Sequence, residues 1–288
     1  MKRSVKLAAV LLFCATTSLF ASEAVVSHCD GGACPQEKGT DAQGVFEQND
    51  GSGHSLILRQ LFAASVDLQT DEQLPRWLAY RIVSGSVGVA SLLPREWRAD
   101  SLLTQRALPN LAEDARTRFV QPDLSGSQDR DYRMTEVTLL AAEQGRLAPM
   151  TSFSGTPLWQ ELNLLSNRAR LPSGLRLGPW SRLDQALNEL AQRLPSQADG
   201  RPEAIYVISG PLPKSPTGPT GFFKIARLKG SYAAFAFPAT TQSHADYCES
   251  LTALESLEAR AQINYFPAGG ELSNDLAAAL GCPSLNLE

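Results

Sequence analysis

Residues 178–194 have the hydrophobic periodicity of an amphipathic helix. Their large apolar side chains follow one another at steps of three and four: Trp180, Leu183, Leu187, Leu190 and Leu194. This spacing places them on one face of an α-helix. Pro179 suits the first helical turn, and Pro195 ends the helix. The sequence therefore predicts a helix here whose apolar face, Trp180 included, lies in the core.

Short apolar runs elsewhere in the chain predict strands. These runs cover residues 56–67, 77–83, 135–140, 204–209, 222–226, 232–237 and 263–266. Further helices are predicted over residues 247–261 and 272–280. Loops rich in Pro, Gly, Ser and Asp are predicted over 99–131, and a stiff hairpin loop over 211–220. Because the strands flank the helices without regular βαβ alternation, we expect an α+β fold with a central antiparallel sheet flanked by helices.

The N-terminus has the pattern of a secretory signal peptide. Lys2, Arg3 and Lys6 precede a short apolar run over residues 7–20, and small residues follow from Ala21. An uncleaved anchor is the alternative, but the run is shorter than the roughly 18 residues that span a bilayer. We expect residues 1–21 to be a signal peptide, 22–54 a polar segment and 55–288 one domain. The chain would then be exported, to the periplasm or the medium, with no transmembrane segment after cleavage.

The charge of the chain bears on its partners. The 288 residues include 26 Lys+Arg and 30 Asp+Glu. Removal of residues 1–21 takes away three basic residues and no acidic one, which leaves a net charge of −7. A polyanionic ligand would therefore need a local basic patch. Hydrophobic residues make up 43% of the chain and charged residues 19%, which excludes a disordered protein.

The cysteines support the same compartment. Four remain after Cys14 leaves with the signal: Cys29, Cys34, Cys248 and Cys282. An even number in an exported chain favours two disulfides. Cys29 and Cys34 would close a tight loop, which leaves Cys248 to pair with Cys282. A zinc site is the competing interpretation, but it is disfavoured because the chain has one short-range Cys pair and three histidines.

Several segments together carry a family resemblance. In order, they cover residues 77–82, 94–97 (Pro-Arg-Glu-Trp), 145–149, 162–167, 175–184, 206–212 and 219–224. By their shared order and spacing, over about residues 29–282, the chain resembles the secreted DNA/RNA non-specific endonuclease family. The resemblance implies the ββα-metal (His-Me finger) nuclease fold in a single domain. It also implies the disulfides Cys29–Cys34 and Cys248–Cys282.

The resemblance further implies a set of catalytic positions. In the family, a His in an Asp-Arg-Gly-His motif is the general base and an Asn carries hydrated Mg²⁺. An upstream Arg stabilises charge on the phosphate, and a helical Glu orients the waters of the metal. The corresponding positions in this chain are Arg146 for the His, Arg176 for the ligand Asn, Asp184 for the Glu, and the retained Arg95, Asn163 and Asn167.

The substitutions by arginine change the expected chemistry. A guanidinium has no lone pair that accepts a proton, so Arg146 cannot act as a base. Arg176 offers no oxygen to a cation that prefers oxygen ligands. We therefore expect a pseudonuclease with no cofactor, in which Arg95, Arg146 and Arg176 bind a phosphate of DNA, RNA or another polyanion. A protein partner is a second candidate for such a binding module.

Other interpretations of the same residues stay open at this stage. Arg176 paired with Asp184, and Arg146 with Glu143, would give a neutralised site in a decayed enzyme. An active DNA/RNA endonuclease that uses Mg²⁺ and a base from outside the family pattern is the alternative function. The arginines of the segment before and inside the helix would form a solvated charged surface or a local positive face: Arg168, Arg170, Arg176 and Arg182.

Overall fold

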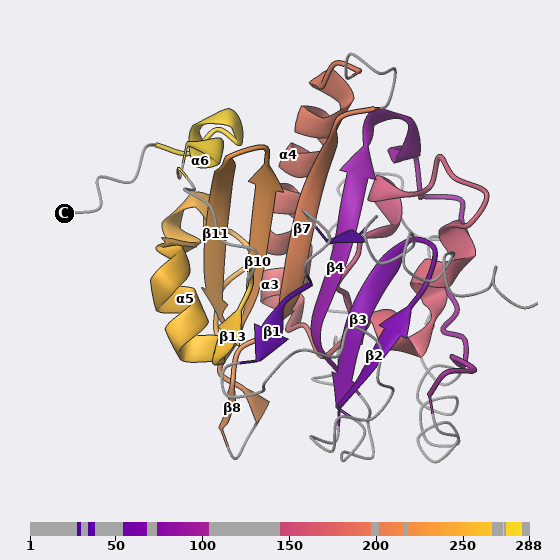
Figure 1. Cartoon of the computed structure of the whole chain (residues 1–288), viewed down its shortest axis with the longest axis horizontal. Helices are drawn as coiled ribbons and strands as arrows, with labels where there is room; N and C mark the ends of the chain where they lie inside the picture. The colour runs from indigo at the N-terminus through magenta and orange to yellow at the C-terminus, as the bar shows by residue number, and fades with distance from the viewer. Residues whose placement is uncertain are drawn as a thin grey trace, which may run out of the picture.

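A seven-stranded antiparallel sheet forms the centre of the fold (Figure 1). The computed structural model describes residues 28–29, 34–37, 54–67, 74–103, 145–196, 202–215, 218–266, 273 and 275–283. The strand order of the sheet is β12-β11-β10-β7-β4-β3-β2. Its strands are β2 (His54–Leu58), β3 (Phe62–Asp67), β4 (Pro75–Val83), β7 (Ala204–Pro211), β10 (Gly221–Leu228), β11 (Ser231–Pro238) and β12 (Leu251–Thr252). The predicted α+β class is confirmed.

Both faces of the sheet are buried, because successive side chains of a strand point to opposite sides. On β4, Leu78 and Tyr80 belong to one hydrophobic cluster, whereas Trp77 and Ala79 belong to another. Because both faces are buried, the strands at 77–83 and 222–226 have nearly continuous apolar sequences. Three two-stranded pairings complete the β structure: β1 (Gln36–Glu37) with β13 (Ile263–Asn264), β5 (Gly145–Arg146) with β6 (Arg168–Ala169), and β8 (Lys214–Ser215) with β9 (Gly218–Pro219).

Helix α4 (Pro179–Arg193) lies across one face of the sheet, behind β7 and β10 in Figure 1. It confirms the predicted helix and its buried face, and Pro179 is its first residue. Trp180 packs edge-on against Phe222 and Phe237 of the sheet. The other helices are α3 (Ser173–Leu177), α5 (Leu254–Ala261) and α6 (Leu276–Ala279), with 3-10 turns at Ser84–Ser86, Met150–Ser152, Trp159–Asn163, Leu165–Asn167 and Tyr247–Ser250.

The predicted helix over 247–261 is wrong in its first half. The chain instead forms a 3-10 turn, Tyr247–Ser250, and then the short strand β12 before α5 begins at Leu254. The side chain of Asp246 accepts a hydrogen bond from the Cys248 amide, which caps the turn. Strand β12 then pairs with β11 and supplies hydrogen bonds to the edge of the sheet. These tertiary pairings outweigh the helical periodicity of the segment.

Both cysteine pairs form disulfides. The Cα atoms of Cys29 and Cys34 are 5.0 Å apart, and those of Cys248 and Cys282 are 5.3 Å apart. The proposed signal peptide, most of the 22–54 segment, the 135–140 strand and residues 104–131 lie outside the described residues. In the described part of the chain, no helix has the length and apolarity needed to cross a membrane.

Candidate functional site

A cavity of about 430 Å³ lies beside the N-terminal half of α4. Arg95 reaches its wall from the loop that follows Ser84–Ser86, Arg146 from β5, Arg176 from α3, and Asp184 from the second turn of α4. The fold thus brings four of the residues singled out in the sequence to one cavity. Their separation along the chain shows that tertiary structure assembles the site.

Close backbone packing sets the position of α3 and α4. Gly178 links the two helices, and a Cβ atom there would lie 2.4 Å from the carbonyl oxygen of Ser243. Arg182 also donates hydrogen bonds to the Ser243 carbonyl, at 3.0 Å, and to the Ala245 carbonyl. The 243–245 loop therefore holds the junction that places Arg176 and Asp184 on the cavity.

Arg146 is a structural centre of the site, because its side chain binds several segments around the cavity, and it also contributes a positive charge. Its Nε donates to the carbonyl of Leu162 at 3.1 Å, and its Nη2 donates to the carbonyl of Arg95 at 2.8 Å and to Asn163 Oδ1 at 2.6 Å. The guanidinium carbon lies 4.4 Å from the centre of the Trp97 ring. Burial, followed by the charges of Arg95 and Arg176, lowers the pKa of Arg146 to about 10. Arg146 is therefore cationic at neutral pH.

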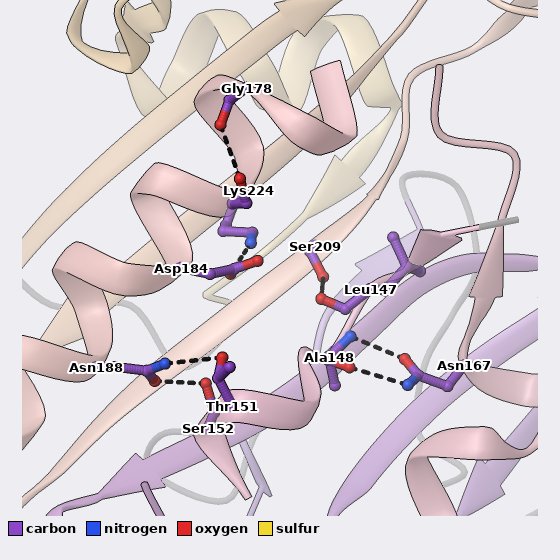
Figure 2. A network of polar contacts seen from close by, with 11 residues as sticks. Leu147, Ala148, Thr151, Ser152, Asn167, Gly178, Asp184, Asn188, Ser209 and Lys224 are labelled. Carbon is purple, nitrogen blue, oxygen red and sulfur yellow. Dashed lines mark hydrogen bonds and ion pairs between the residues drawn. The ribbon is translucent and has the colours of Figure 1, made fainter. Parts of the chain in front are cut away.

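The two retained asparagines hold main chain around the site. Asn163 donates to the carbonyl of Pro94 at 2.9 Å and accepts from Arg146. Asn167 is fully buried, accepts from the amide of Ala148 at 2.8 Å and donates to the carbonyl of Ala148 at 3.0 Å (Figure 2). It also donates to the carbonyl of Leu162 at 3.0 Å. Neither side chain is among those that line the cavity. The sequence grouped both asparagines with the catalytic positions. In the structure their side chains bind the main chain next to the cavity.

Asp184 forms an ion pair with Lys224 of β10, whose Nζ donates to Asp184 Oδ1 (Figure 2). The sequence offered Arg176 as a partner of Asp184, and the structure adds a second cation, Lys224, bound to Oδ1 of the same carboxylate. Burial raises the pKa of Asp184 and lowers the pKa of Lys224, and the ion pair opposes both shifts. Sequence reasoning missed Lys224, although a lysine inside the apolar run 222–226 was a usable signal.

A second polar contact ties α4 to the wall of the cavity. Ser152 donates to Asn188 Oδ1 at 2.6 Å, and Asn188 Nδ2 donates to Thr151 Oγ1 at 3.0 Å (Figure 2). Thr151 and Asn188 both line the cavity. Because these side chains satisfy one another, they contribute shape and rigidity to the wall.

The described residues that line this cavity do not fit a magnesium site. Mg²⁺ requires oxygen ligands in octahedral geometry. Among the described residues of the lining, Asp184 is the carboxylate, and it is paired with Lys224. The amide oxygen of Asn163 accepts from Arg146. Over the described residues, no group of three or more His, Cys, Asp or Glu side chains could hold a metal.

One of the arginines near the helix, Arg168, does not lie on the surface. Arg168 is buried, with 1% of its surface exposed, and Arg182 is bound to the 243–245 loop. The solvated charged surface expected from Arg168, Arg170, Arg176 and Arg182 is therefore wrong for Arg168, which packs into the interior. The pairing expected between Arg146 and Glu143 involves a residue outside the described ranges.

Comparisons with known proteins agree with the fold. No family model matches the chain. The chain is 26% identical over 226 residues to a protein named Nuclease from Serratia marcescens, an alignment that covers 73% of this chain and 74% of the relative. It is also similar to a chain in the crystal structure of the EndoG/EndoGI complex, with a TM-score of 0.52 and 18% identity over 76% of this chain and 89% of that chain. The protein thus has the fold of the DNA/RNA non-specific endonuclease family.

Proposed function

We propose that this protein binds phosphate groups of nucleic acid in the arginine-lined cavity, without a metal and without hydrolysing the phosphodiester. The observation that carries the proposal is the charge of the lining. Of the lining side chains in the described ranges, Arg95, Arg146 and Arg176 are cationic, and the carboxylate of Asp184 is neutralised by Lys224. Guanidinium groups match phosphate oxygens with paired hydrogen bonds. The cavity therefore favours an anion although the chain as a whole is acidic.

Loss of hydrolysis follows from the groups at the two essential positions. Arg146 stays protonated at neutral pH and cannot take a proton from water. Absence of a general base by itself costs roughly a hundred- to ten-thousand-fold in rate. Arg176 stands where the family has its metal ligand. A guanidinium has no lone pair with which to coordinate a metal ion, and its charge repels one. Both losses act in the same direction, so we expect a nucleic-acid-binding pseudonuclease.

Export of the chain is part of this proposal. The two disulfides fit an oxidising compartment. The N-terminal pattern of residues 1–21 supplies a route, and the destination is the periplasm or the medium. Nucleic acid released outside the cytoplasm would be the accessible ligand, and the similarity to a protein named Nuclease supports that ligand class.

Fluorescence anisotropy with a short labelled oligonucleotide tests the binding. We expect equal affinity in EDTA and in Mg²⁺, because arginines take the place of the metal. Arg95→Gln and Arg176→Gln should each weaken binding roughly ten- to a hundred-fold, since each removes hydrogen bonds from a charged donor. The matched control is Arg193→Gln, which replaces an exposed arginine in the last turn of α4, away from the cavity.

A plasmid-degradation assay tests the absence of hydrolysis. Purified protein should leave supercoiled plasmid intact in Mg²⁺ and in EDTA. Cleavage that requires Mg²⁺ and is lost in Asp184→Asn would support the alternative function, an active metal-dependent DNA/RNA endonuclease. Binding that requires Mg²⁺ would equally overturn the arginine-pocket proposal.

A further inference from the structure

Lys224 occupies a position in the sheet that normally carries an apolar side chain. It lies on β10 between Phe222 and Ala226, and these two neighbours pack in the cluster that faces α4. The side chain of Lys224 is completely buried. A charged group in such a place is retained only with a partner, because transfer of an unpaired charge into the interior is costly. The placement therefore calls for a specific reason.

The contacts of Lys224 show how its charge is matched. Its ammonium group donates to Asp184 Oδ1 and lies 4.0 Å from the centre of the Trp180 ring. Asp184 and Trp180 both line the arginine cavity, whereas Lys224 does not. The Asp184 side chain retains 8% exposure against 0% for Lys224. Asp184 is thus the member of the pair that reaches the cavity, and Lys224 lies behind it.

We propose that Lys224 determines the sign of the cavity, because its buried charge cancels that of Asp184 and leaves the arginines to select an anion. This inference rests on the proposed function and adds a residue that controls its specificity without touching the ligand. Lys224 therefore acts on the ligand through Asp184 and not by direct contact. Without it, a carboxylate on the cavity wall would face the bound phosphate at short range, where the low dielectric constant makes repulsion strong.

A charge cycle at the two positions tests the inference. The variants are Lys224→Met, Asp184→Asn and the double variant Asp184→Asn/Lys224→Met, with affinity for the labelled oligonucleotide measured in EDTA. Lys224→Met should weaken binding at least about tenfold, since it leaves Asp184 uncompensated. Asp184→Asn should bind at least as tightly as the wild type, because it removes the carboxylate that faces the ligand whether or not the buried Lys224 stays protonated. The double variant should return to within about twofold of the wild type.

The order of the affinities separates this role from a purely structural one. Each single variant breaks the buried pair and is expected to lower stability, so a structural role would weaken binding in both. Weaker binding by Lys224→Met together with no loss of binding in Asp184→Asn arises from charge and not from lost structure. If Lys224→Met does not fold, the comparison of Asp184→Asn with the wild type and the double variant still decides. Binding by Asp184→Asn that is weaker than that of the wild type, or binding by Lys224→Met equal to that of the wild type, would overturn the inference.

Failure of the proposed function has a different signature. A wild-type protein whose oligonucleotide binding is absent, or is unchanged by Arg95→Gln and Arg176→Gln, contradicts the arginine pocket itself. Arginine-dependent binding that is insensitive to the Lys224 and Asp184 substitutions leaves the pocket in place and overturns the role of Lys224 alone.

Discussion

Replacement of Arg146 by methionine tests whether this side chain holds the site together or only contributes charge. The three hydrogen bonds of its guanidinium join β5 to Leu162 and Asn163 and to the carbonyl of Arg95. Bonds from a charged donor contribute roughly 1.5–3 kcal/mol each. The lower end applies here because water in the adjoining cavity can solvate the acceptors, which gives about 4.5 kcal/mol for the three. The contact with Trp97 adds about 0.5–1 kcal/mol.

The buried charge of Arg146, unlike these contacts, lowers the stability of the folded protein. Burial and the two neighbouring arginines lower its pKa to about 10. That shift corresponds to roughly 3 kcal/mol against the charged form at neutral pH. The contribution of the contacts exceeds the cost of the charge, and the difference predicts that Arg146→Met lowers the free energy of unfolding by about 2 kcal/mol. If Arg146 were only a repelled cation, the same substitution would stabilise the protein.

Urea denaturation followed by tryptophan fluorescence measures this difference. We expect the midpoint to fall in Arg146→Met with an unchanged denaturant slope. The exposed Arg193 supplies the matched control, and Arg193→Met should change stability by less than about 0.5 kcal/mol. A midpoint for Arg146→Met at or above that of the wild type would refute the assignment of Arg146 as a structural centre.

Two further predictions concern other parts of the fold. Gly178→Ala should cost roughly 1–3 kcal/mol or more and weaken oligonucleotide binding, because the new Cβ would meet the Ser243 carbonyl oxygen at 2.4 Å. Gly85→Ala, where nothing lies within 4 Å, should show neither effect in the same assays. Burial lowers the pKa of His28 from 6.5 to about 4, so the unfolded chain binds more protons between these values and stability should fall by up to about 3 kcal/mol as the pH drops through this window. Urea midpoints measured across the window should vary less in His28→Gln, and a slope equal to that of the wild type would contradict this role of His28.

Periodicity and composition determined much of the architecture. Local patterns predict the buried face of α4, the strands β4, β7, β10 and β11, and the α+β class. The spacing of the apolar residues in an element determines which of its sides is buried. The arginines at 146 and 176 exclude a base and a metal ligand whatever the fold does, since that exclusion is a property of the guanidinium group.

Tertiary structure alone decided which groups meet. The helical pattern of 247–261 yields to the pairing of β12 with β11, whose hydrogen bonds depend on a strand distant in sequence. Asp184 forms an ion pair with Lys224, forty residues away along the chain. No local spacing encodes that choice, because it depends on where α4 crosses the sheet and on the register of β10. Charge balance in the cavity is therefore a property of the folded protein, whereas the chemistry of each side chain belongs to the sequence.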